Sequence, residues 1–365
     1  MKKGLIIFFV IILVLLAAAG GTFLYLKNWY EGNLKAVGSE GKGEEIKLEI
    51  EKGTGTADIA ALLEKNKVIR NADAFKIYLK LNKKNNLQAG KYSFNNGKED
   101  VKAVVEKLTS GDVDDDSVTI TFVEGKTIKD YAKTIASKTN NTMEEVFDLL
   151  KDEEYINSLI EKYWFLTDEI KNEDIYYPLE GYLKPDTYTF ENEDVSISYI
   201  FNYILNYTEK FLDTYREDIE NSGYTVHEIL SLASIIEKEA SNTEDMPGIS
   251  GVFYNRLKSK MSLGSDVTTY YAFQIDLAES DLTNAQINTY NAYNTRGPNM
   301  NGKLPVGPIC NPSENAMKAA INPEISDYYY FVSDKTGKTY FTKNYNEHQK
   351  LVQQLKADGL WYVYE

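Results

Sequence analysis

The chain has 365 residues, of which 43% are hydrophobic, enough to bury at least one large core and to form two or three domains. This composition excludes a disordered protein. The formal net charge of −15 argues against nucleic acid and against electrostatic adhesion to anionic lipid. An uncharged or weakly charged polymer is the better candidate for a binding partner.

The N-terminus contains an apolar segment long enough to cross a bilayer. Residues 4–26 carry no charged side chain, and about 20 apolar residues suffice for a transmembrane helix. Residues 1–3 include two lysines, which predicts a cytoplasmic tail and an extracytoplasmic remainder, although Lys27 weakens this bias. A cleaved signal peptide is the alternative, because positions 17–21 are small residues, but the apolar run is longer than a usual signal core. We therefore favour an uncleaved anchor.

The segment after the span predicts a tether and then a small folded module. Residues 27–44 are largely polar and contain glycine, which is typical of a linker. The region 45–111 has the pattern of a strand, a turn and two helices. These elements are expected at residues 46–50, 53–55, 57–65 and 72–81, respectively.

A similar order of elements recurs further along the chain. A strand, a turn and two helices are expected at residues 118–122, 124–125, 128–137 and 143–150. The first module resembles the βααβ unit called LysM, which holds glycans containing N-acetylglucosamine, and residues 118–150 form a second LysM-like subunit. The alternative is a spacer domain that binds nothing. The overall fold class is predicted to be α+β.

All eight prolines lie between Pro178 and Pro323, which indicates a change to a part of the chain rich in fixed turns. Residues 179–190 combine two carboxylates with two tyrosines beside a Pro-Asp turn. Aromatic faces stack on pyranose rings and carboxylates accept hydrogen bonds from hydroxyl groups, so this mixture suits a sugar site. The alternative is a turn capped by Asp186, with tyrosines that only pack.

Glu237 is the best candidate for chemistry. At 100° per residue it shares a helical face with apolar residues, whereas two nearby glutamates point the other way. The residues on its face are Leu230, Ala233 and Ala240, and the outward glutamates are Glu228 and Glu239. A carboxyl group partly removed from water holds its proton more tightly, which suits a general acid near neutral pH. The alternative is a glutamate at a helix end that reaches solvent.

Other reactive residue types are scarce. Cys310 is the only cysteine, so no internal disulfide forms and a lipoprotein anchor is excluded. Two histidines, His227 and His348, are too few for a histidine-rich metal cluster. Of the four arginines, Arg256 and Arg296 fall in the motif-rich region, where each could grip a carboxylate or simply carry surface charge.

Four motifs occur together in the second half of the chain. They are residues 179–190, residues 233–240, residues 252–257 with 263–268, and residues 293–295 with 304–312. In this order they closely resemble the endolytic murein transglycosylases of the MltG (YceG-like) family, and the resemblance extends from the anchor to residues 330–332 and 347–348. It implies a catalytic domain over residues 117–365 that cleaves peptidoglycan within a strand and leaves an anhydro sugar, without metal or cofactor.

The resemblance also implies roles for individual residues. The family's catalytic glutamate falls on Glu237, which the helical pattern had also selected. The residues expected to line the cleft are Glu180, Tyr182, Asp186, Tyr188, Asn255, Arg256, Asp266 and Thr268. The chain departs from the family pattern at Gly264 and Val267, where glutamine and proline are usual, and at Thr339, where histidine is usual. These departures concern loop geometry and fine specificity.

The implied mechanism needs one carboxyl group. The 6-hydroxyl of N-acetylmuramic acid attacks its own anomeric carbon, and Glu237 protonates the leaving oxygen and then accepts the hydroxyl proton. The sugar's acetamido group, Asp186 or Asp266 could support the positive charge that develops. The alternatives are a membrane-anchored glycan-binding scaffold without activity and a hydrolytic muramidase with a second carboxylate. Membrane peptidoglycan synthases (penicillin-binding proteins) are candidate partners at the outer face of the bacterial cytoplasmic membrane.

Overall fold

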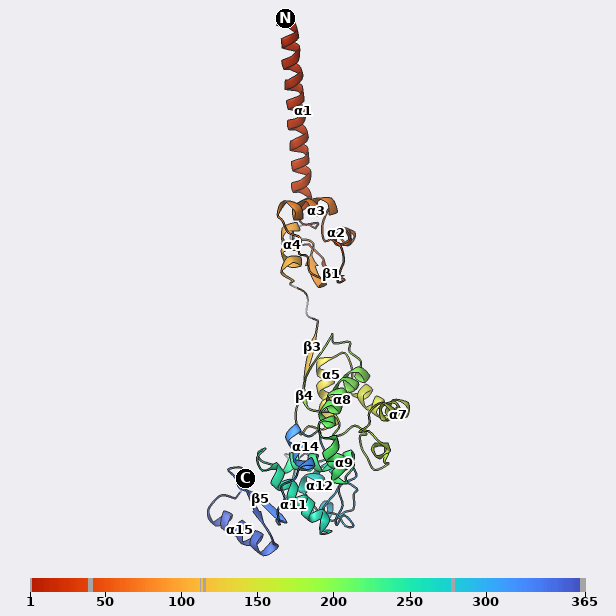
Figure 1. Ribbon diagram of the computed structural model, residues 1–365, viewed down its shortest axis with the longest axis vertical. Coiled ribbons are helices and arrows are strands. Elements are labelled where there is room, and N and C mark those ends of the chain that lie inside the picture. The colour runs from red at the N-terminus through yellow and green to blue at the C-terminus, as the bar shows by residue number, and fades with distance from the viewer. Residues whose placement is uncertain (1, 39–41, 112, 114–115, 277–279, 362–365) are drawn as a thin grey trace. The chain divides into compact units, whose positions relative to one another are not determined.

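The computed structural model describes residues 2–38, 42–111, 113, 116–276 and 280–361. The chain divides into two compact units, Met1–Asp116 (unit one) and Ser117–Glu365 (unit two), each with its own hydrophobic core (Figure 1). Helices and short strands are mixed in both units, in agreement with the predicted mixture of helix and sheet.

Unit one begins with the long apolar helix α1 (Lys2–Leu34). Within Ile7–Leu34, a window of 18 residues has a mean hydropathy of 2.7 and none of it is buried, so the helix is long and apolar enough to cross a membrane. The helix continues through Lys27, which pairs with Glu31 one turn later. Leu34 at its end packs against the core of unit one. The first part of the segment predicted as a tether is therefore helical.

The rest of unit one has the order strand, helix, helix, strand, helix. Its elements are β1 (Glu45–Ile50), α2 (Thr56–Lys65), α3 (Ala72–Leu81), β2 (Gly90–Asn95) and α4 (Val101–Ser110). The two strands pair antiparallel, with Ile46 opposite Phe94. Helices α2, α3 and α4 each contribute one buried face to the same core as Tyr92 and Phe94, which have no exposed surface. The strand and helices expected within residues 46–81 are present.

Unit two opens with the second strand and helix pair. The elements up to the central helix are β3 (Val118–Phe122), α5 (Ile128–Lys138), α6 (Met143–Lys151), α7 (Glu153–Lys162), η1 (Asp168–Lys171), β4 (Asp186–Phe190), α8 (Ile197–Asp213) and α9 (Arg216–Ser222). Strand β3 pairs antiparallel with β4. The alternating residues of this ribbon place Ile120 and Tyr188 in the core and threonines toward solvent. The strand partner of the second module thus comes from the tyrosine-containing motif.

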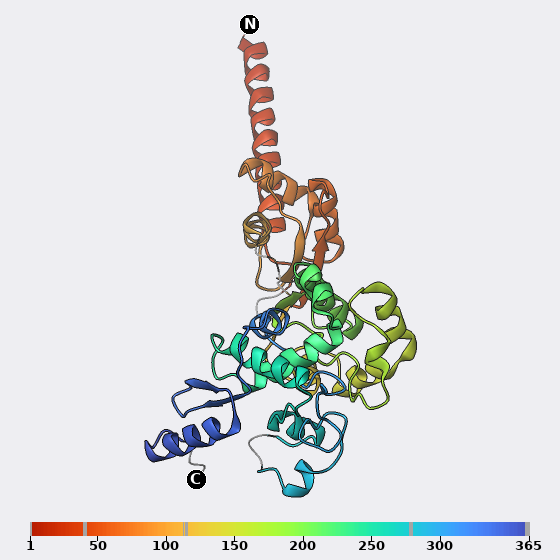
Figure 2. The same cartoon turned by 60° about the horizontal axis from the view of Figure 1, so that its bottom comes forward.

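The remaining elements surround the helix that carries Glu237. They are α10 (Val226–Glu239), α11 (Met246–Lys258), α12 (Asp266–Ala272), α13 (Asn284–Ile287), α14 (Glu314–Ile321), β5 (Tyr330–Ser333), β6 (Thr339–Thr342) and α15 (Tyr345–Ala357). Helix α10 packs against α11, α12 and α14. Figure 2 shows β5, β6 and α15, in blue, at one end of unit two.

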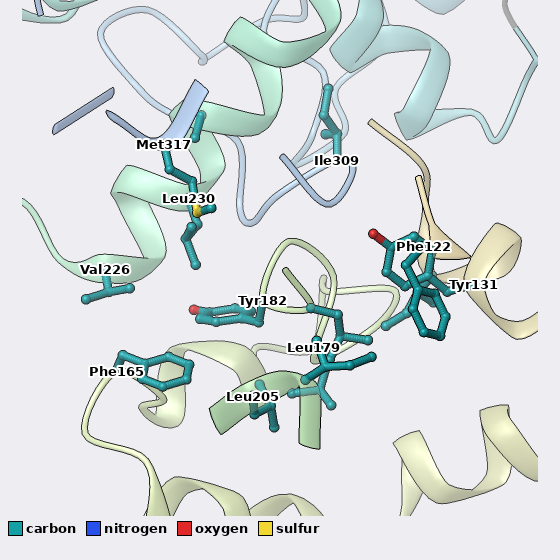
Figure 3. Packing of buried hydrophobic residues seen from close by; sticks show 14 of the residues in the cluster. Phe122, Tyr131, Phe165, Leu179, Tyr182, Leu205, Val226, Leu230, Ile309 and Met317 are labelled. Carbon is teal, nitrogen blue, oxygen red and sulfur yellow. The ribbon is translucent and has the colours of Figure 1, made fainter. Parts of the chain in front are cut away.

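Helix α10 is the centre of the core of unit two. Apart from the half-buried Glu228, all residues from Val226 to Ile236 are buried, so residues 229–236 are enclosed on every side and not only along one stripe. Figure 3 shows Leu230 of α10 above the ring of Tyr182, with Val226 to the left above Phe165 and Met317 of α14 beside Leu230. Burial ends at Glu237, in the last turn of the helix.

Candidate active site

Glu237 lies at the point where the buried helix α10 reaches the surface. The helix begins with a capping box in which Thr225 and Glu228 exchange hydrogen bonds. It ends two residues after Glu237, and Ala240 has left the helical conformation. Glu237 is half-buried, whereas Ile236 before it is fully buried. The fold therefore presents the Glu237 carboxyl group at the edge of an apolar core. Glu239, which the helical spacing predicted to point outward, is half-buried: it accepts a hydrogen bond from the Ser265 hydroxyl, and burial raises its pKa.

Ser313 holds one oxygen of that carboxyl group. The Ser313 backbone N–H and hydroxyl both donate to Oε2 of Glu237, over 3.0 and 2.5 Å. Ser313 is also the N-cap of α14, where its hydroxyl oxygen accepts from the Ala316 N–H. The start of α14 thus fixes the side-chain orientation of Glu237. No hydrogen bond from the described part of the chain reaches Oε1.

Gly125 faces the other oxygen. Its φ is +67°, a backbone conformation that favours glycine. A Cβ atom at this position would lie 3.5 Å from Oε1 of Glu237. The Gly125 N–H donates to the Asn311 carbonyl over 2.9 Å, which ties this turn to the loop before Ser313. Because Gly125 has no side chain, Oε1 of Glu237 stays accessible to a ligand.

An acidic hollow lies next to the turn that faces Glu237. It has a volume of about 480 Å³ and contains the charged residues Glu124, Lys184, Asp186 and Glu314. Glu124 precedes Gly125 and Glu314 follows Ser313, so the hollow shares its border with the residues that contact Glu237.

Electrostatics in the acidic hollow depend on Lys184, whose side chain is only 9% exposed. Lys184 lies 3.2 Å from Asp186 and 3.1 Å from Glu314. A hydrogen bond from the Thr187 N–H, together with Lys184, lowers the pKa of Asp186. Partial burial acts to raise the pKa of Glu314, but the lysine contacts lower it overall. The pKa of Glu124 is raised, first by desolvation and then by the charge of Glu237.

A second hollow of about 360 Å³ borders Gly125 on another side. It contains Lys126, Lys129, Lys133 and Lys238, and we call it the lysine hollow. Lys238 follows Glu237 directly, and its ammonium group lies 3.5 Å from the Gly125 carbonyl oxygen. Both hollows therefore adjoin the turn at Glu124 and Gly125 that faces Glu237, and the Glu237 side chain itself lines neither hollow.

Glu180, predicted to line the cleft, is only 1% exposed. It accepts hydrogen bonds from the Ile128 N–H over 3.0 Å, the Tyr271 hydroxyl over 3.0 Å and the Asn311 side-chain amide over 3.3 Å. Burial raises its pKa to about 8 despite the hydrogen bond from Ile128. Glu180 thus joins the start of α5, helix α12 and the loop before Ser313 beneath the site.

The two tyrosines of the same motif are also in the core. The His227 Nε2–H donates to the Val306 carbonyl, so Nδ1 accepts from the Tyr182 hydroxyl over 2.7 Å. The Tyr188 hydroxyl donates to the Lys184 carbonyl over 2.8 Å. These contacts match the alternative in which the tyrosines pack and fix the loop. Of the four residues of this motif that were predicted to line the cleft, Asp186 alone lines one of the two hollows.

The other four predicted cleft residues bind neighbouring segments of the chain. The Asn255 amide donates to the Ser326 and Tyr328 carbonyls. Arg256 donates to the carbonyls of Tyr329 and Leu263. The hydroxyl of the fully buried Thr268 lies 2.8 Å from the Thr295 hydroxyl, and Asp266 pairs with Arg296. These contacts hold the approach to β5 and the loop before α12. A contact of these residues with substrate stays a prediction.

The positions that depart from the family pattern have simple local roles. Gly264 has φ of +63°, which explains a glycine in this turn. Val267 lines the lysine hollow. The Thr339 hydroxyl lies 2.9 Å from that of Ser333 across the β5–β6 pair.

Several site residues were not selected from the sequence. Ser313 has an N-cap signal, since a serine follows Pro312 and precedes a helix that starts with Glu314. That signal predicts a helix start and says nothing of a partner 76 residues away. Gly125 was expected only as a turn residue, and no sequence pattern indicated a role for Lys184 in the site.

A family model described as YceG-like matches residues 48–354 of the chain. The chain belongs to the YceG-like family. Two curated relatives are named endolytic murein transglycosylase. The one from Bacillus subtilis is 35% identical over 91% of this chain and 89% of its own length. The one from Streptococcus pneumoniae is 32% identical over 85% of this chain, which spans 58% of that longer protein.

A solved structure of the YceG-like family agrees with this membership. The crystal structure of a yceG-like protein from Listeria monocytogenes is 37% identical in sequence and aligns with a TM-score of 0.60. The alignment covers 85% of this chain and all of the other.

Proposed function

We propose that this YceG-like protein is an endolytic murein lytic transglycosylase in which Glu237 is the single general acid and base. The observation that carries the proposal is the placement of Glu237: Ser313 fixes one carboxyl oxygen, and the other faces Gly125. Gly125 lines the lysine hollow and follows Glu124, which lines the acidic hollow. The names of the relatives from Bacillus subtilis and Streptococcus pneumoniae support the reaction.

The proposed reaction cleaves the glycan strand without adding water, so the two products together contain all the atoms of the substrate. Protonated Glu237 gives its proton to the oxygen that links N-acetylmuramic acid to N-acetylglucosamine, and the bond from the anomeric carbon to that oxygen breaks. The 6-hydroxyl of the same muramic acid attacks the anomeric carbon, and the Glu237 carboxylate accepts its proton. A 1,6-anhydro ring forms, and Glu237 is protonated again. Because the nucleophile belongs to the substrate, its effective concentration is high.

Neighbouring carboxylates can stabilise the positive charge that develops at the anomeric carbon. Asp186, with its lowered pKa, stays ionised in the acidic hollow next to the turn that faces Glu237. Both aspartates pair with a basic residue, Asp186 with Lys184 and Asp266 with Arg296, but Asp266 lines neither of the two hollows. We therefore assign electrostatic support to Asp186.

Unit one would hold the enzyme at the membrane and near glycan. Helix α1 is proposed as a single-pass anchor with residues 1–3 in the cytoplasm and unit two outside. We assign residues 45–111 to a LysM-like module that binds glycan, because β1, α2, α3 and β2 have the order of that module and its strands pair antiparallel. Residues 118–150 form a second LysM-like subunit within the catalytic domain. Membrane peptidoglycan synthases are proposed partners, since they release new strands at this surface.

The decisive experiment compares the wild-type protein with Glu237→Gln on purified glycan strands. The glutamine oxygen can still accept both hydrogen bonds from Ser313, so we expect the variant to fold and to bind strands. Loss of the proton donor should lower the cleavage rate by about two to four orders of magnitude. Mass spectrometry of the products measures the anhydromuramyl ends.

Each alternative gives a different product. A scaffold without activity leaves strand length unchanged in the wild-type protein. A muramidase incorporates oxygen from ¹⁸O-labelled water into the new end, whereas the anhydro product contains none. Anhydro products formed at an unchanged rate by Glu237→Gln would exclude Glu237 as the acid.

A further inference from the structure

The lysine hollow differs in charge from the rest of the chain. The protein has a net charge of −15, yet this hollow is lined by four lysines and two aspartates, Asp130 and Asp276. Asp130 accepts from the Thr127 N–H and hydroxyl over 3.1 and 3.0 Å in the capping box that starts α5. A ligand entering this hollow therefore meets an excess of positive charge.

The lysines remain available to a ligand. Lys126 and Lys133 are exposed and form no ion pair with the described residues. Lys129 donates to the neutral Gln274 side chain over 2.6 Å. Lys238 lies near the neutral carbonyl of Gly125. Ammonium groups without an acidic partner attract carboxylates, and the concave wall limits their screening by solvent.

The acidic hollow has the opposite charge, with three carboxylates against Lys184. An anionic substituent placed there would be repelled, whereas neutral sugar hydroxyls can donate to its carboxylates. The two hollows that adjoin the turn at Gly125 therefore select different chemical groups. This difference gives a bound strand one preferred direction.

Murein supplies an anionic group close to the bond that breaks. Muramic acid carries a short peptide through its lactyl ether, and this peptide stem has free carboxylates. We propose that the lysine hollow binds the acidic peptide stem of the muramic acid residue at the cleavage point. The inference rests on the proposed transglycosylase function and adds a determinant of substrate choice.

The walls of the lysine hollow suit a peptide of small residues. Tyr177 and Tyr270 are half-buried there, beside Val267, Ile275 and Ile309. Apolar walls of this kind accept methyl side chains, and tyrosine hydroxyls can form hydrogen bonds with backbone amides. A volume of about 360 Å³ accommodates part of a stem, with the remainder in solvent.

The test uses the full-length protein and two substrates: glycan strands with intact stems, and the same strands stripped of stems by an amidase. The variant is Lys126→Gln with Lys133→Gln. Since each exposed ion pair contributes only weakly to binding, we expect KM for stem-bearing strands to rise on the order of fivefold, with kcat unchanged. KM for stripped strands, which keep only the lactyl carboxylate on the sugar, should rise less. In the wild-type protein, added salt should raise KM more for stem-bearing strands than for stripped ones.

A matched control removes two other exposed lysines, Lys335 and Lys350, which lie outside both hollows. Lys335→Gln with Lys350→Gln should leave both KM values unchanged, which separates local binding from net charge. Equal KM changes for the two substrates in the Lys126/Lys133 variant, or no change, would overturn the inference while the transglycosylase function stands. A wild-type protein that cleaves neither substrate would overturn both.

Discussion

At the residue scale, the motif that resembles a sugar site is mostly a set of buried anchors. Glu180 accepts from three segments that meet beneath Glu237, and Tyr182 binds His227. A buried acid with raised pKa is often taken as a catalytic residue. Its enclosure points instead to a role in holding Gly125 and Ser313 at the right distance from Glu237.

Glu180 gives a prediction about the pH dependence of stability. Its pKa rises from 4.5 to about 8 on folding. The folded state therefore binds a proton that the unfolded state releases above pH 4.5, and stability falls as pH rises from 4.5 to 8. Chemical unfolding of the wild-type protein and Glu180→Gln across this range should show a difference on the order of 5 kcal/mol in their pH dependence.

One outcome of these unfolding measurements would contradict the prediction for Glu180. The glutamine variant keeps a neutral side chain of the same shape, and the Tyr271 hydroxyl can turn to accept from it. Parallel pH profiles for the two proteins would show that Glu180 is not protonated on folding.

At the element scale, α14 connects helix capping to catalysis. Its N-cap residue Ser313 both starts the helix and holds Glu237, so the end of α10 and the start of α14 act together. The two helices pack against each other in the core. The position of the carboxyl group is therefore determined by helix packing rather than by a flexible loop.

Ser313→Ala should lower both stability and activity. Loss of an N-cap costs about 1 kcal/mol. Loss of a hydrogen bond to a charged group, about 1.5–3 kcal/mol, should lower kcat/KM about ten- to a hundredfold if the contact persists in the transition state. Thermal unfolding and the cleavage assay measure the two effects.

A second capping serine provides the control. Ser196 caps α8, where its hydroxyl oxygen accepts from the Tyr199 N–H over 3.3 Å. Ser196→Ala should lower stability by a similar amount and leave cleavage unchanged. An equal loss of activity in both variants would mean that Ser313 acts only through stability.

At the scale of the whole molecule, the two units have separate cores, and Glu237 and both hollows belong to unit two. Unit one adds an apolar helix and a small strand-helix-helix-strand module. Chemistry and localisation are thus assigned to different parts of the chain.

A fragment of residues 117–365 should therefore fold and cleave soluble strands with unchanged kcat. Because unit one is proposed to bind glycan, its removal should lower the effective concentration of long strands near the site in unit two. KM should therefore rise about tenfold or more for long strands, but not for short ones. Kinetics with strands of graded length measure this difference. The same KM shift at every length would argue against glycan binding by unit one.

The sequence determined those features that depend on neighbours along the chain. The apolar helix follows from an uninterrupted hydrophobic segment, the strands and helices of residues 46–81 from local periodicity, and the place of Glu237 from its spacing on α10. Family membership was also recognisable from ordered motifs. Each of these signals lies within a few turns of chain.

Only the tertiary structure decided which polar groups meet. Ser313 reaches Glu237 across 76 residues, and Asn311 reaches Glu180 across 131. Helical periodicity did not show that α10 is enclosed on all sides, because that depends on helices contributed by distant segments. Motif residues such as Thr268 and Tyr188 could equally line a cleft or fix its walls. The choice depends on packing, because a polar side chain buried with its hydrogen bonds satisfied supports the site from beneath instead of facing a ligand.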